Sequence, residues 1–248
     1  MLSDPQQAEL NDVRWLKSSG EVHDPDFRCF GNMGDSQGLE IVDVGANRGQ
    51  SIVSFKAVLP DARIVAFEAN AFFGPVLSEV ATWYEGVAVF NVGLGRADHR
   101  AVLRVPVVDG RYYWEEGSIR SDSFEKPWVK ARLASYGAKL QFEEYVVEIR
   151  RADSMLRDAR ADIVKIDVEG AELDVLSAME DLLDRSRPLF MIENSDWHSV
   201  TAWLSERDYL CYQYLPDDNL LVPFSQACTN AFYLPAHYDG PLASIMRR

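Results

Sequence analysis

Cysteine, basic side chains and long apolar runs are all scarce in this sequence. Three cysteines in 248 residues lie far apart without zinc-site spacing, so neither a disulfide framework nor structural zinc is expected. The 25 Lys and Arg residues face 39 Asp and Glu residues, which disfavours a nucleic-acid partner because phosphate binding needs basic side chains. No apolar run approaches a membrane span, and the first residues lack the regions of a signal peptide. We therefore expect a cytoplasmic protein with no membrane and no nucleic-acid partner.

A strand, a glycine-bearing turn, a helix and a second strand are predicted between residues 39 and 68. The apolar run at 39–44 indicates a buried strand, and apolar residues then recur with helical spacing through 50–59 until Pro60. A second buried strand is expected at 63–67, and Glu68 follows it directly. In a doubly wound sheet this arrangement places an adenosine-type ligand over the turn, with the acid accepting hydrogen bonds from the ribose hydroxyls.

The turn after Asp43 lacks the features that bind a pyrophosphate. Its glycines do not form G-x-G-x-x-G, and no Walker lysine follows. The negative charge of Asp43 suits a cationic ligand, and S-adenosylmethionine carries both an ammonium and a sulfonium group. The alternative is that Asp43-Val44-Gly45 merely closes a tight strand-to-helix turn. The residues expected to contact the cofactor are Asp43, Gly45, Ala46, Asn47, Gly49, Ser51, Glu68, Ala69, Asn91, Val92 and Asp167.

Carboxylates gather where two later strands, at 162–167 and 188–193, are expected to end. Asp167, Glu169 and Glu172 follow the first of them, and Glu193 ends the second. Charged groups are costly to bury unless they are paired or used, so this group favours a functional role. Part of the pattern has a plainer explanation, since Glu169 and Glu172 would also be stabilised at a helix N-terminus.

Removal of a proton from an acceptor hydroxyl requires a base, and the candidates are Asp167, Glu169, Glu172 and His198. His198 has the natural titration range, although a lone histidine after a strand is more often structural. A second route uses Mg²⁺ to acidify the hydroxyl, with Asp167, Glu169 and Glu193 as hard oxygen ligands. The metal-free route is preferred, because no ligand spacing is diagnostic.

The pattern predicts one α/β domain at 39–248, preceded at 1–38 by an N-terminal helix and a loop. In that helix, Leu10, Val13, Trp15 and Leu16 are expected to make the apolar contacts. Strands alternate with helices, and a terminal pair at 209–214 and 230–234 is joined by a loop. This order is typical of a mostly parallel sheet with an antiparallel edge strand and helices on both faces.

An aromatic and glycine-rich insertion occupies about 107–143. We expect its Tyr112, Tyr113 and Trp114 to form a substrate lid, because insertions with exposed aromatic residues often wall a binding site. The alternative is a homodimer contact.

Three motifs in this order resemble the FkbM-type S-adenosylmethionine-dependent methyltransferases. They are VDVGANRG at 42–49, AFEAN at 66–70 and VKIDVEGAE at 164–172, and the resemblance covers roughly 39–194. The family usually has a proline after the glutamate, where this chain has Ala69. The resemblance implies a class I (Rossmann-like) methyltransferase fold, with a seven-stranded sheet whose last strand is antiparallel. It also implies S-adenosylhomocysteine as a product, and usually O-methylation of a small hydroxylated metabolite, sugar or natural product.

Two other function classes stay open. One is a nucleotide-dependent oxidoreductase, which the missing phosphate loop disfavours. The other is a non-catalytic binding protein on the same fold, which the retained carboxylates disfavour. The identity of the acceptor is not encoded in any of the motifs.

Overall fold

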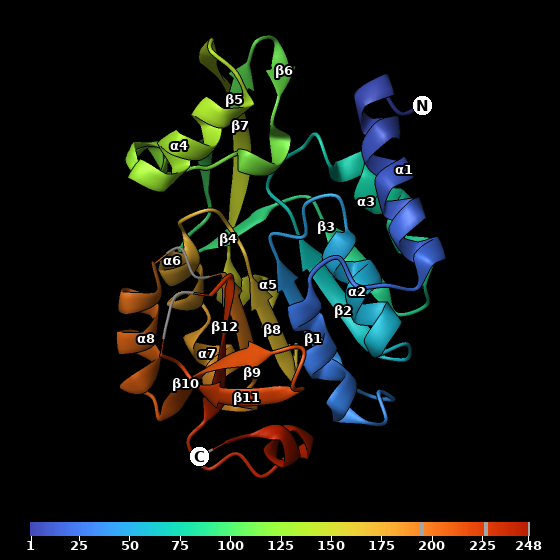
Figure 1. The fold of residues 1–248 in the computed structure, drawn as a ribbon, viewed down its shortest axis with the longest axis vertical. Coiled ribbons are helices and arrows are strands. Elements are labelled where there is room, and N and C mark those ends of the chain that lie inside the picture. The colour runs from blue at the N-terminus through green and yellow to red at the C-terminus, as the bar shows by residue number, and fades with distance from the viewer. Residues whose placement is uncertain (194–195, 226–227, 248) are drawn as a thin grey trace.

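The computed structural model describes residues 1–193, 196–225 and 228–247. In these residues the main sheet has eight strands, in the order β11-β10-β12-β9-β8-β1-β2-β3 (Figure 1). The strands are β1 (Glu40–Val44), β2 (Arg63–Phe67), β3 (Val87–Phe90), β8 (Ile163–Ile166), β9 (Leu189–Glu193), β10 (Tyr209–Leu215), β11 (Leu220–Pro223) and β12 (Asn230–Pro235). The strands predicted around the two motif-bearing turns are therefore present within one or two residues of the expected bounds.

The sheet is parallel from β3 through β2, β1 and β8 to β9, and antiparallel from there to its other edge. The α/β class and the antiparallel edge are confirmed, but the expected number of seven strands is wrong. The additional strand is β11, which pairs antiparallel with β10 after a turn that places Asn219 at φ 51°. Its apolar run at 220–222 is short and lies between Pro216 and Pro223, a pattern that favours a loop.

Helices cover both faces of the main sheet (Figure 1). On one face lie α1 (Asp4–Ser19), α2 (Gln50–Val58) and α3 (Gly74–Ala81), and on the other α5 (Ala152–Met155), α6 (Glu172–Leu176), α7 (Glu180–Ser186) and α8 (Trp197–Ser205). Successive side chains of a strand point to opposite faces, so Ile41 enters the first core while Val42 and Val44 enter the second. No helix in the described ranges is both long and apolar enough to span a membrane.

Helix α1 begins and ends as its sequence predicts. Ser3 and Gln6 form a capping box, and Gly20 ends the helix in the left-handed conformation at φ 69°. Leu10, Val13 and Leu16 are buried as expected, but Trp15 is 71% exposed, so its expected apolar contact is wrong. Two residues turn a helix by about 200°, which places Trp15 on the side opposite Val13.

The insertion belongs to a second sheet that stands above the main one (Figure 1). In the described chain its order is β4 (Gly93–Gly95), β7 (Leu140–Arg151), β5 (His99–Val108) and β6 (Arg111–Tyr112). β5 pairs over its whole length with residues 140–149 of β7, so both strands continue into the range assigned to the insertion. The segment between them carries the short helices η2 (Trp114–Glu116) and η3 (Ser121–Glu125) and the helix α4 (Pro127–Tyr136).

Candidate active site

A cavity of about 240 Å³ lies where the carboxyl ends of β1, β2 and β8 meet the insertion. Of the residues predicted for a site, those that line it are Gly45, Asn47, Glu68, Ala69, Trp114, Asp167 and Glu169. The predicted residues that do not line it are Asp43, Ala46, Gly49, Ser51, Asn91, Val92, Tyr112, Tyr113, Glu172, Glu193 and His198. Most residues of the second group lie one layer further from the cavity and contact the residues that line it.

The backbone amides of the turn between β1 and α2 are already used. The N–H groups of Gly45 and Ala46 both donate to the carbonyl oxygen of Phe67, at 2.9 and 3.0 Å. The N–H of Asn47 donates to Glu68, that of Arg48 to the side chain of Asn47, and that of Gly49 to the carbonyl of Ala46. A phosphate cradle requires such amides to point at the ligand, so this turn is not built as one.

Glu68 is held in position at the end of β2. Its Oε2 accepts a hydrogen bond from the Asn47 N–H at 2.8 Å, and its Oε1 accepts one from the Asn70 N–H at 2.7 Å. Burial raises the pKa of Glu68 above its usual value, while the two backbone bonds oppose that shift. Each carboxylate oxygen has a further lone pair, so the oriented group can still accept two ligand hydroxyls. Asn91 supports this loop from behind, because its side-chain N–H group donates to the Glu68 carbonyl at 2.7 Å.

Lys165, on β8, links Asp43 and Gly45 at the end of β1 to Asp167 after β8. Its Nζ donates to the Gly45 carbonyl at 3.0 Å and lies 3.3 Å from Asp43 Oδ1 and 3.4 Å from Asp167 Oδ2. Burial alone would lower the pKa of Lys165, but the two carboxylates raise it above its ordinary value. Asp43 is fully buried and also accepts a hydrogen bond from Ser51 Oγ at 2.5 Å. It therefore contacts Lys165 and Ser51 behind the cavity wall.

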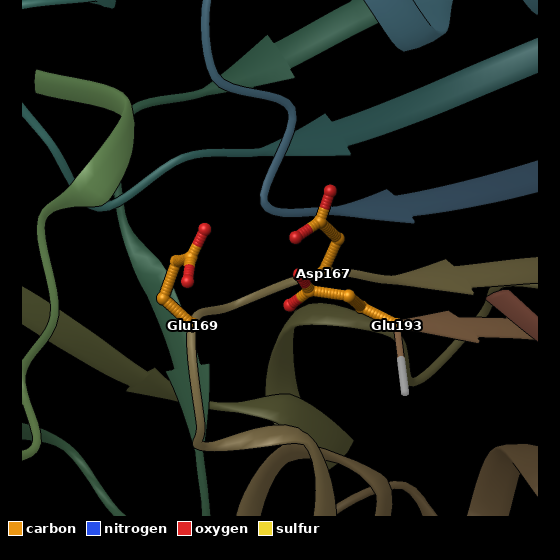
Figure 2. Close-up of side chains that lie close together, drawn as sticks. All are labelled: Asp167, Glu169 and Glu193. Carbon is orange, nitrogen blue, oxygen red and sulfur yellow. The ribbon is translucent and has the colours of Figure 1, made fainter. Parts of the chain in front are cut away.

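Asp167, Glu169 and Glu193 converge at the carboxyl ends of β8 and β9 (Figure 2). One carboxylate oxygen from each lies within 4.8 Å of the other two. Burial and the neighbouring Asp167 raise the pKa of Glu169 to about 8, and the same two causes raise the pKa of Glu193 well above its usual value. Oxygen ligands in this arrangement could hold a hard divalent cation.

The remaining base candidates lie elsewhere. Glu172 is fully buried, and its Oε1 accepts a hydrogen bond from the Gly170 N–H at 2.8 Å, so it closes the turn that leads into α6. His198 is exposed on α8, and its ring stacks on Trp197 with 3.5 Å between the centroids. Neither side chain lines the cavity.

The insertion is fastened to both sides of the cavity. On one side Trp114 stacks on Phe72 with ring centroids 4.0 Å apart. On the other, the buried hydroxyls of Ser118 and Ser123 donate to the Glu169 carbonyl at 2.7 and 3.1 Å. These bonds hold Glu169 in the left-handed conformation, at φ 53°, which a non-glycine residue seldom adopts.

Of the three predicted lid aromatics, Trp114 alone lines the cavity in the described chain. Tyr112 stacks on the ring of Trp114, 4.9 Å away between centroids, and its hydroxyl donates to Glu143. Tyr113 is buried and stacks on Tyr136 at 4.2 Å.

Sequence reasoning missed Lys165 and Arg132. A lysine inside the apolar run at 163–166 was the available signal for the first, since a buried ammonium needs carboxylate partners. Arg132, on α4, also lines the cavity and forms an ion pair with the buried Glu116. Nothing in the pattern of α4 distinguishes Arg132 from a solvated arginine, because its partners come from other parts of the chain.

We expect Trp114→Ala to raise the KM of an acceptor substrate about tenfold and to change kcat much less, since the indole forms part of the cavity wall. Steady-state kinetics with any acceptor that is turned over would measure this. Trp128→Ala is the control, because Trp128 lies on the same insertion, 46% exposed and outside the cavity. Unchanged kinetics together with a changed oligomeric state would favour the dimer-contact hypothesis.

Comparison with known proteins gives a matching family model and several similar proteins. A family model described as "Methyltransferase FkbM domain" matches residues 43–211. Methyltransferase 1 of Beauveria bassiana is 31% identical over 150 residues, which are 57% of this chain and 58% of that protein. Methyltransferase sdnD of Sordaria araneosa is 28% identical over 159 residues, 57% of this chain and 60% of its own length. The chain thus matches less than two thirds of either relative.

A comparable fold is found in a solved structure. It is a methyltransferase FkbM from Methylobacillus flagellatus KT, which superposes with a TM-score of 0.52 and 16% sequence identity. The match covers 80% of this chain and 44% of the other. At this identity the likeness concerns the fold alone.

Proposed function

Because this chain belongs to the FkbM methyltransferase family, we propose that it is an S-adenosylmethionine-dependent O-methyltransferase. We propose as its acceptor a hydroxyl of a small metabolite, sugar or natural product. S-adenosylmethionine supplies an electrophilic methyl group, and S-adenosylhomocysteine is the product. The observation that carries the proposal is the Glu68 carboxylate, which two backbone N–H groups orient at the cavity wall.

The residues at the cavity fit such a ligand. Glu68 would hold the ribose diol, and a side chain at position 45 would collide with the backbone of Asp167, so the glycine keeps the floor of the cavity open. Acidic side chains outnumber the single arginine among the charged groups that line the cavity: Glu68, Glu115, Glu116, Asp167 and Glu169 against Arg132. This charge suits a ligand with a sulfonium and an ammonium group.

The same features disfavour a nicotinamide or adenine nucleotide cofactor. A pyrophosphate would meet an acidic lining and a turn whose N–H groups at 45–49 are already bonded within the protein. Binding it would require exchanging those bonds, at a cost of roughly 1–3 kcal/mol for each buried group left unsatisfied.

Methyl transfer requires a nucleophile that is held in line and relieved of its proton. Asp167 and Glu169 are the predicted base candidates that line the cavity. Lys165 lies 3.4 Å from Asp167, whereas burial raises the pKa of Glu169 to about 8. In the metal-free route, one of these two carboxylates takes the hydroxyl proton, and a base so placed contributes typically about 10²–10⁴-fold.

Calorimetric titration with S-adenosylhomocysteine tests the cofactor proposal. Wild-type protein should bind it more tightly than NAD or ATP. Glu68→Ala should weaken that binding by at least about tenfold, because each charge-assisted bond to a ribose hydroxyl is worth about 1.5–3 kcal/mol. A dissociation constant unchanged within about threefold would remove Glu68 from the site.

Two further variants sharpen the experiment. Glu68→Gln keeps the shape of the side chain and removes its charge, so it should lie between alanine and wild type. Glu79→Ala is the control, since Glu79 is an exposed carboxylate on α3 that pairs with Arg14. Turnover of labelled S-adenosylmethionine with hydroxylated metabolites then separates an enzyme from a non-catalytic binding protein.

A further inference from the structure

We propose that Asp167, Glu169 and Glu193 form a binding site for one divalent cation of the Mg²⁺, Mn²⁺ and Ca²⁺ class. The catalytic consequence rests on the proposed function, but the site itself is argued from the residues alone. It gives a role to Glu193, which follows a different strand from the other two acids and does not line the cavity.

The spacing of the three side chains matches such an ion. One oxygen from each lies within 4.8 Å of the others, and Figure 2 shows the Asp167 and Glu193 carboxylates close together with Glu169 facing them across the strand ends. Ca²⁺–oxygen bonds of about 2.3–2.6 Å allow ligand oxygens up to about 5 Å apart, and Mg²⁺ allows up to about 4.2 Å. Ca²⁺ would therefore fit with little movement, and the smaller ions of this class after a small contraction of the site.

Glu193 provides the independent observation. Its Oε2 is buried, and no hydrogen-bond donor reaches it in the described part of the chain. A buried carboxylate oxygen without a partner is costly, and such groups normally pair with a cation, accept hydrogen bonds or coordinate a metal. Figure 2 shows this carboxylate directed toward Asp167, so the missing partner belongs between the two side chains.

Protein cations do not neutralise this group. Lys165 is shared between Asp43 and Asp167. Arg132 is bound to Glu116 and reaches Glu169 only at 3.8 Å. No basic side chain of the described ranges forms an ion pair with Glu193, so negative charge remains for an added cation to balance. The competing explanation is a proton shared among the three carboxylates.

The ion's contribution would be electrostatic. Bound beside the cavity, it would lower the pKa of an acceptor hydroxyl that reached it, and the hydroxyl proton would pass to solvent. This route replaces the preference for a metal-free base, which rested on the lack of a diagnostic ligand spacing in the sequence.

Direct binding measurements test the site. The full chain is treated with EDTA and desalted, and Mn²⁺ is titrated into it while the electron paramagnetic resonance of the free ion is followed. Wild-type protein should take up one ion per chain, and Glu193→Gln should weaken that binding by at least about tenfold. Asp184→Asn, which removes an exposed carboxylate on α7, should bind like wild type.

Glu193→Gln also relieves repulsion between buried acids, so the free energy of unfolding of this variant in EDTA should not fall. Loss of Mn²⁺ binding then cannot be attributed to unfolding. No uptake by wild type, or equal uptake by Glu193→Gln, would overturn the proposal in favour of the shared proton. If the protein binds S-adenosylhomocysteine but no Mn²⁺, this inference is wrong and the proposed function stands. If it binds Mn²⁺ but no S-adenosylhomocysteine, the proposed function is wrong and the cation site stands. Turnover should disappear in EDTA and return with Mg²⁺.

Discussion

Lys165→Met should lower the free energy of unfolding by about 3–5 kcal/mol, because it leaves a buried carboxylate without its countercharge. Asp43 is 0% exposed and Lys165 is 3% exposed, so water cannot replace the lost ammonium. The substitution also removes the bond from Nζ to the Gly45 carbonyl, which connects β8 to the turn after β1. Urea denaturation followed by circular dichroism would measure the change.

A double variant distinguishes the charge effect from simple loss of packing. Lys165→Met leaves the Asp43 carboxylate unpaired, and adding Asp43→Asn removes that charge. The double variant should therefore recover part of the stability lost in Lys165→Met, rather than show the sum of the losses of the two single variants. Arg14→Met is a control, because it breaks an exposed pair with Glu79 and should cost less than about 1 kcal/mol. A loss below about 1 kcal/mol for Lys165→Met would show that the ion pair does not hold these strands together.

The sequence predicted those parts of the site that follow directly from parallel strands. The carboxyl ends of such strands share one edge, so the sequence alone places Glu68 after β2, Asp167 after β8 and Glu193 at the end of β9 on that edge. Gly45 was predicted from the glycine-bearing turn that follows the first strand. The turn glycine lies where the backbones of β1 and β8 come closest to each other.

The parts that escaped prediction depend on contacts between distant segments. The insertion was expected as a lid, but its pattern did not show that Ser118 and Ser123 hold the Glu169 carbonyl, or that Trp114 rather than Tyr113 faces the cavity. Tyr113 and Trp114 are adjacent in the sequence, but Tyr113 stacks on Tyr136 whereas Trp114 stacks on Phe72. For Asp43 the motif itself was predicted correctly. Its ion-pair partner, Lys165, lies on another strand, so the motif did not reveal that contact.

Gly45→Ala should abolish binding of S-adenosylhomocysteine, with a loss of at least about 100-fold, because the added methyl group has no space. A Cβ at this position would lie 1.7 Å from the Asp167 carbonyl oxygen and 2.7 Å from its carbon, and both atoms are backbone. The β1 turn and the β8 end must separate to admit it, and the cavity floor and the Lys165 contact lie between them. A misplacement of about 1 Å can cost on the order of 100-fold in reaction rate, and we expect a loss of similar size in binding here.

The control for Gly45→Ala must carry the same backbone strain without the collision. Gly38 meets this condition, with φ at 83° against 82° for Gly45 and no atom within 4 Å of its added Cβ. Gly38→Ala should therefore cost about 1 kcal/mol in unfolding free energy from the left-handed conformation and leave S-adenosylhomocysteine binding unchanged. Calorimetry on both variants separates the two effects. The contrary result is that Gly45→Ala binds S-adenosylhomocysteine within about threefold of wild type. That result would show that the backbone at the cavity floor can move to admit the methyl group and that cofactor binding does not depend on its position.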